Sequence, residues 1–164
     1  MSDEDLRRRL RDAYKHRALL YYHIYDELRQ EGGEQKAKAI LQRAIARRGR
    51  ELGAKFAPYA PGDMAGLERA FVHASPVHQW LFEPVVERCD AGGLDVQHRR
   101  CPLKEAWQEA GLGDRTVATL CEIAAAVDAG TFEAAGFAFH CDTWTPGGDG
   151  CCHLHIRPGK GEET

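Results

Sequence analysis

Cysteine and histidine residues gather in the C-terminal part of the chain. Five of the six cysteines lie in the last 64 residues, with three histidines among them: Cys101, Cys121, Cys141, Cys151 and Cys152, and His140, His153 and His155. Thiolate sulfur and imidazole nitrogen are the ligands that zinc and iron commonly take in proteins. A thiolate is also a strong nucleophile. The pattern therefore predicts a metal site or a reactive thiol.

A metal site would require ligands from distant points of the chain. The first-choice ligands are three thiols, and the fourth position is open to one of three further donors: Cys101, Cys121 and Cys152, joined by His98, His153 or Asp128. A bound Zn²⁺ or iron would lower the pKa of its water from about 15.7 toward about 7, which makes hydroxide available near neutral pH. An iron–sulfur cluster is a further arrangement for the same thiols.

A thiol nucleophile is the second interpretation of the same residues. Cys101 immediately precedes an expected helix, and Arg99 and Arg100 come just before it. The helix dipole and these two cations would favour its thiolate form. Asp128 or a histidine would then move protons. The catalytic set predicted in this way is Cys101, Asp128 and Cys152. The same cysteines could also be ordinary core residues, since buried free cysteine is common.

Helices are expected in both halves of the chain. Apolar residues recur at steps of three and four over residues 3–29 and 34–52, which is typical of amphipathic helices. Pro102 and Asp114 favour helix starts at 102–110 and 114–128, and Gly130 is expected to end the second of these. Arginines on the second helix form a solvated face or supply one side chain that grips a substrate carboxylate: Arg43, Arg47, Arg48 and Arg50.

Strands are expected in two hairpins, 83–90 with 94–101 and 136–144 with 151–157. Residues alternate between the two faces of a strand. In the last strand this predicts Cys152 on the core face with Leu154 and Ile156, and Cys151 on the opposite face with His153 and His155. The segment 71–80, which contains His78, could line a pocket.

These elements predict an α+β fold. We expect N-terminal helices packed on a four-stranded, mostly antiparallel sheet, built from the two hairpins with a helical insertion between them. Residues 1–157 are expected to form one domain, with a helical part at 1–56 and a Cys/His-rich sheet part at 83–157. Residues 158–164 are expected to be a flexible tail.

Composition narrows the function. The chain has 164 residues and a formal net charge of -3, which gives no reason to expect binding to nucleic acid or to an anionic membrane. The charged N-terminal segment does not resemble a signal peptide, and no apolar run is long enough to span a bilayer. A cytoplasmic protein with reduced thiols is therefore expected. A cluster of tyrosines on the first helix leaves a homodimer open: Tyr14, Tyr21, Tyr22 and Tyr25.

One set of residues resembles the signature of a known family. Cys-Pro before a helix, a helical Cys, a following Asp and a terminal Gly-Asp-x-x-Cys strand fall here on Cys101-Pro102, Cys121, Asp128, Gly148-Asp149 and Cys152. This pattern, over residues 95–157, resembles the L-2-amino-thiazoline-4-carboxylic acid hydrolase family. The resemblance implies a hydrolase that opens a small cyclic amidine or thiazoline-type carboxylic acid, with a small molecule as its partner. The alternative is a non-catalytic module that senses a metal, an iron–sulfur cluster or a small ligand.

Overall fold

Two long helices form the N-terminal part of the protein. The computed structural model describes residues 1–161, and it begins with α1 (Asp3–Gly32) and α2 (Glu34–Gly53). The Ser2 hydroxyl accepts a hydrogen bond of 3.1 Å from the Asp5 backbone amide and caps α1. Gly33 joins the helices at a φ of 84°, a conformation that glycine adopts without steric cost. The two helices therefore form a hairpin, and the sequence predicts each of the two helices.

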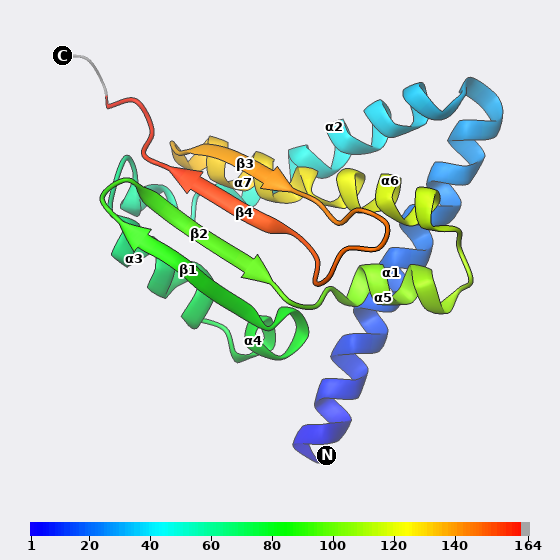
Figure 1. Cartoon of the computed structure of the whole chain (residues 1–164), viewed down its shortest axis with the longest axis horizontal. Helices are drawn as coiled ribbons and strands as arrows, with labels where there is room; N and C mark the ends of the chain where they lie inside the picture. The colour runs from blue at the N-terminus through cyan, green and yellow to red at the C-terminus, as the bar shows by residue number, and fades with distance from the viewer. Residues whose placement is uncertain (162–164) are drawn as a thin grey trace.

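Short helical segments connect this hairpin to the sheet. They are η1 (Ala57–Tyr59), α3 (Met64–Glu68), the π-helical η2 (Arg69–His73) and α4 (Pro76–Phe82). The Asp63 carboxylate accepts a hydrogen bond of 2.8 Å from the Gly66 amide at the start of α3. The Ser75 hydroxyl caps α4 in the same way. Helix α3 packs against the first two strands, and α4 leads directly into the first of them (Figure 1).

The sheet has four antiparallel strands in the order β1-β2-β4-β3. Its strands are β1 (Pro84–Asp90), β2 (Gly93–His98), β3 (Ala138–Asp142) and β4 (His153–Arg157). Between β2 and β3 run α5 (Pro102–Glu109), α6 (Asp114–Ala124) and α7 (Ala126–Ala135). The α+β class and the two hairpins with a helical insertion are confirmed.

One face of the sheet is buried and the other is open. Leu94, Val96, Leu154 and Ile156 are fully buried on the inner face, which packs on α3 and α7. The long helices α1 and α2 pack mainly on α5, α6 and α7 (Figure 1). The core therefore has two parts, one under the sheet and one among the helices.

Close approach of α2 and α7 depends on glycine. A side chain at Gly130 would meet the Ala46 carbonyl oxygen at 2.3 Å, and one at Gly49 would meet the Val127 carbonyl oxygen at 2.2 Å. The expectation that Gly130 ends a helix is wrong: it lies inside α7, and the helical axis instead breaks near Ala125, between α6 and α7. Glycine is present here for contact between backbones.

Within residues 1–161, every helix is too short or too polar to cross a lipid bilayer. The expected tail at 158–164 reaches past the described residues, because 162–164 lie outside them.

Candidate functional site

A cavity of 390 Å³ lies between the N-terminal helices and the end of β2. Its apolar wall includes Ile45 from α2, Phe71 from η2, Phe82 from α4 and Leu103 from α5. Its polar lining comes from almost every part of the chain: Tyr14, Arg17, Arg48, His78, His98 and Asp128, with the thiols of Cys101, Cys151 and Cys152. An apolar cavity with a few convergent polar groups is the usual form of a small-molecule site.

The thiols of the cavity meet at the turn before β4. Mutual backbone hydrogen bonds of 2.9 Å, from Cys151 to the His98 carbonyl and from His98 to the Cys152 carbonyl, fix this turn to the end of β2. The Cys151 thiol contacts the thiols of both Cys101 and Cys121, and its sulfur lies 3.5 Å from that of Cys152. Cys151 is therefore the centre of a group of four thiols, of which Cys152 alone is only partly buried.

Three of these thiols, those of Cys101, Cys121 and Cys152, are held in the protonated form. Contact with Cys151 and burial raise the pKa of Cys101 well above its usual range, although the backbone amides of Lys104 and Leu103 oppose the shift. Contact with Cys151 and burial also raise the pKa of Cys121. Contact with Cys141 and burial raise the pKa of Cys152, and Cys151 opposes them.

The pKa of Cys101 is raised, whereas the sequence analysis expects a favoured thiolate and so a lowered pKa. Arg99 is exposed, and the Arg100 guanidinium pairs with the carboxylates of Glu105 at 2.8 Å and Glu83 at 3.4 Å. Neither cation stabilises a thiolate at Cys101. Activation of this thiol would require a base that takes its proton.

Two histidines form a neutral pair in the wall of the cavity. His78 Nδ1 lies 3.0 Å from the Phe71 carbonyl oxygen, so this nitrogen donates a hydrogen bond and carries the proton. His78 Nε2 therefore accepts from His98 Nε2, 3.0 Å away. Burial and the neighbouring His78 lower the pKa of His98 to about 3, and burial lowers the pKa of His78. Both rings are uncharged near neutral pH.

Asp128 is the cavity's titratable acid. It lies in the first turn of α7, and burial raises its pKa from 3.8 to about 7, while Arg17 opposes the shift. The Arg17 guanidinium carbon lies 4.4 Å from the centre of the Tyr14 ring. A carboxyl with a pKa near 7 is available as both acid and base at neutral pH. Asp128 can therefore accept and donate protons in this cavity.

The structure brings most of the predicted site residues to one place. Cys101, Cys152, His98 and Asp128 all line the cavity, and Cys121 is buried behind it against Cys151. His153 does not reach the cavity, because its imidazole lies near Glu87 on the outer side of the sheet. The roles of these residues stay predictions.

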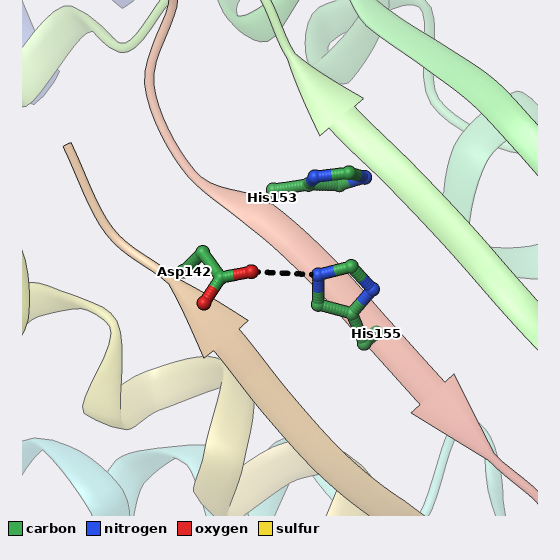
Figure 2. Close-up of side chains that lie close together, drawn as sticks. All are labelled: Asp142, His153 and His155. Atoms are coloured by element: carbon green, nitrogen blue, oxygen red, sulfur yellow. Dashed lines mark hydrogen bonds and ion pairs between the residues drawn. The ribbon is translucent and has the colours of Figure 1, made fainter. Parts of the chain in front are cut away.

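The closest group of potential metal ligands lies outside the cavity, on the sheet. Among residues 1–161, one group of three or more potential ligands has atoms within 4.8 Å of one another, and it consists of Asp142, His153 and His155 (Figure 2). The predicted metal site with Cys101 and Cys152 is not preformed to this tolerance, and it stays a prediction.

Sequence reasoning missed several cavity residues. Cys151 was expected on the outer face, yet it is buried, because the regular strand begins only at His153 and the alternation does not extend back through the turn. Tyr14 and Arg17 reach the cavity from α1, and no local signal marks such distant contacts. Of the four arginines on α2, Arg48 lines this cavity, whereas the others line a separate surface hollow: Arg43, Arg47 and Arg50.

These features define an α+β protein with a cavity lined by thiols, a carboxyl and a histidine pair. The chain belongs to the L-2-amino-thiazoline-4-carboxylic acid hydrolase family, whose family model matches residues 11–156. The match covers every cavity residue named above and extends well beyond the C-terminal pattern seen in the sequence. Comparison with curated proteins and with solved structures gives no match.

Proposed function

We propose that this protein is a hydrolase that opens a small cyclic amidine or thiazoline-type carboxylic acid, such as L-2-amino-thiazoline-4-carboxylate. Family membership supports the substrate class. The observation that carries the mechanism is that Asp128, Cys101 and Cys152 line one cavity. At 390 Å³ the cavity is within the range of about 300–1,000 Å³ that small-molecule sites occupy.

The substrate carboxylate would bind to the arginines of the cavity. Arg17 and Arg48 both line it, and a guanidinium can hold a carboxylate through two parallel hydrogen bonds. Arg48 also pairs with Glu51 at 2.8 Å, whereas Arg17 lies over the Tyr14 ring beside Asp128. Arg17 is therefore the better placed of the two to hold the substrate near the acid.

The ring-opening step consumes one water, and both of its protons move through Asp128. The water oxygen bonds to the amidine carbon, the electron pair of the C=N bond moves to nitrogen, and Asp128 in its ionised form takes the first proton from water and passes it to that nitrogen. The hydroxyl of the tetrahedral carbon then gives its proton to Asp128 as the C=O bond forms and the bond to the ring nitrogen or sulfur breaks, and Asp128 passes this second proton to the leaving atom. The product is a carbamoyl derivative of cysteine. A pKa of about 7 lets one carboxyl serve in both steps.

A thiol can take the place of water in the first step. Cys101 or Cys152 would add to the amidine carbon as its proton passes to Asp128, and the ring C–N or C–S bond would break as Asp128 returns this proton to the leaving atom. Water would then add to the same carbon, a C=O bond would form, and the cysteine sulfur would leave as a thiol that regains a proton through Asp128. A proton acceptor is needed, since the pKa of each thiol is raised. In the metal alternative, Zn²⁺ or iron held by Cys101, Cys121 and Cys152 would supply the water, and binding would displace the thiol protons.

Turnover of L-2-amino-thiazoline-4-carboxylate and related cyclic amidines tests the proposal. Cys101→Ser and Cys152→Ser are expected to lower kcat by about a hundredfold or more if either thiol is the nucleophile. Cys89→Ser is the matched control, because Cys89 lies on β1 beside Glu68 and does not line the cavity. Binding of these compounds without turnover by the wild-type protein would contradict a hydrolase and support a sensing module.

Metal content, measured on the same preparations, separates the two catalytic routes. One zinc or iron per chain that is lost in Cys152→Ser would support the metal alternative. Full activity after chelation, together with trapping of a covalent adduct on a cysteine, would support the thiol route. Unchanged activity in both serine variants and in a metal-stripped sample would support the route in which Asp128 activates water directly.

A further inference from the structure

The outer face of the sheet carries a cluster of histidine and aspartate side chains. Leu154 and Ile156 of β4 point into the core, so the alternating residues His153 and His155 point outward. The register places Asp142 of β3 directly opposite His153. It also places Asp95 of β2 and His140 of β3 on either side of His155.

His155 is held between two carboxylates. Its Nδ1 lies 2.8 Å from Asp95 Oδ1, and its Nε2 lies 2.9 Å from Asp142 Oδ2. The Asp95 side chain is 14% exposed and is fixed by Arg157 at 2.7 Å. Asp95 therefore keeps the proton on Nδ1 and turns the Nε2 atom toward Asp142, as the dashed line in Figure 2 indicates. This carboxylate–histidine pairing is the arrangement that orients histidine ligands in metal sites.

His153 completes the cluster with a poorly satisfied nitrogen. Its Nε2 is shielded from solvent and makes no hydrogen bond of acceptable geometry within residues 1–161, although Glu87 Oε2 lies 2.7 Å away. The rings of His153 and His155 are adjacent, with their centres 4.3 Å apart. A buried nitrogen without a good partner is unfavourable, and coordination to a cation would satisfy it.

We propose that Asp142, His153 and His155 form a Zn²⁺ site on the outer face of the sheet. Two imidazole nitrogens and one carboxylate oxygen suit Zn²⁺, and the fourth position remains for water or Glu87. The candidate ligand atoms lie within 4.8 Å of one another, and small side-chain rotations would bring them to the ~3.3 Å that a tetrahedral ion with ~2.05 Å bonds requires. The ion takes the position between His155 Nε2 and Asp142.

The site is independent of the proposed hydrolase activity. The cavity lies on the inner side of the molecule with His98, whereas the three ligands lie on the outer face. Strand β3 is at the edge of the sheet and pairs with β4 alone. An ion shared by Asp142 and the two histidines of β4 would therefore fasten the edge strand to its neighbour.

Metal titration of the full chain tests this site. After removal of metal with a chelator, Zn²⁺ is expected to bind at one ion per chain and to raise Tm. Co²⁺ is expected to give visible bands of a low-symmetry nitrogen and oxygen site without thiolate charge-transfer absorption. Asp142→Asn and His153→Gln are each expected to weaken Zn²⁺ binding by at least about tenfold, and Asp95→Asn by about 10–100-fold.

Two controls place the ion on this face. His23→Gln removes an exposed histidine on α1, and Cys152→Ser removes a thiol of the cavity; both should leave the Zn²⁺ affinity of this site unchanged. Asp142 is 62% exposed, so its substitution leaves the core intact and a loss of binding cannot come from unfolding. The proposal is overturned by no saturable binding, by full affinity in Asp142→Asn, or by thiolate bands that disappear in Cys152→Ser.

Discussion

Replacement of Asp128 by asparagine should stabilise the protein while it removes activity. Asp128 has a folded-state pKa of about 7 against an ordinary 3.8, because burial disfavours its charged form. As the pH rises, the carboxyl therefore ionises in the unfolded chain before it ionises in the folded protein. The folded state loses stability over this interval, from pH 3.8 to about pH 7. At 1.36 kcal/mol per pH unit, the upper limit of this loss is about 4 kcal/mol. Asparagine carries no such charge.

The free energy of unfolding should therefore differ between Asp128→Asn and the wild type in a pH-dependent way. Near pH 4 the two proteins should be close to equal in stability, since both folded forms are then neutral at this position. Through pH 7 the variant should become more stable by about 1–4 kcal/mol, and the difference should level off above that pH. Urea unfolding at several pH values measures this difference directly.

Activity of the same variant should change in the opposite sense. Loss of a group that transfers protons in the transition state lowers kcat by about 10²–10⁴-fold. The limb of the wild-type pH–rate profile near pH 7 should disappear with it. A variant that is less stable than the wild type at pH 8, or one that keeps the limb near pH 7, would refute the reasoning about this carboxyl.

Three further substitutions test other parts of the site and fold. Arg17→Gln should raise KM by about tenfold or more with a smaller effect on kcat, since it would remove the proposed ground-state contact with the substrate carboxylate; steady-state kinetics decide this. His98, with a pKa of about 3, contributes stability above pH 6.5 that is lost as the pH falls toward 3. The free energy of unfolding should therefore fall less between pH 6.5 and pH 3 in His98→Gln than in the wild type. An equal pH dependence in the two proteins would contradict the buried neutral ring. Gly130→Ala should destabilise by about 1–3 kcal/mol or more, because its Cβ would meet the Ala46 carbonyl at 2.3 Å. Gly113→Ala, which meets nothing within 4 Å, is its control in thermal unfolding.

Much of the fold follows from local patterns in the sequence. The long amphipathic stripes, the capping residues and the strand alternation predict α1, α2, α5 and both hairpins, because each depends on neighbours along the chain. The role of Gly130 could not be predicted from local sequence patterns. The same residue can end a helix or permit two backbones to touch, and the deciding contact with Ala46 lies far away in sequence.

The candidate site was predictable only in part. Cys101, Cys152, His98 and Asp128 were chosen from residue type and family pattern, and they line one cavity. The importance of Cys151 was not visible, because the face that a residue occupies is defined by alternation within a strand and is lost in the preceding turn. The protonation of the Cys101 and Cys121 thiols could not be predicted either, since it depends on which groups surround each sulfur after folding.

The position of β4 between β2 and β3 has a consequence for biosynthesis. This strand follows β3 in the sequence, yet both β2 and β3 take hydrogen-bond partners from it. During translation the first hairpin and the helices can form early, while β3 has no neighbour to pair with until β4 has left the ribosome. The turn at Cys151 and Cys152, which lines the cavity, emerges at the same late moment. A ribosome-bound chain stalled before residue 150 would thus hold a half-built sheet with two bare edges, and it would be a natural client for chaperones that shield unpaired strands.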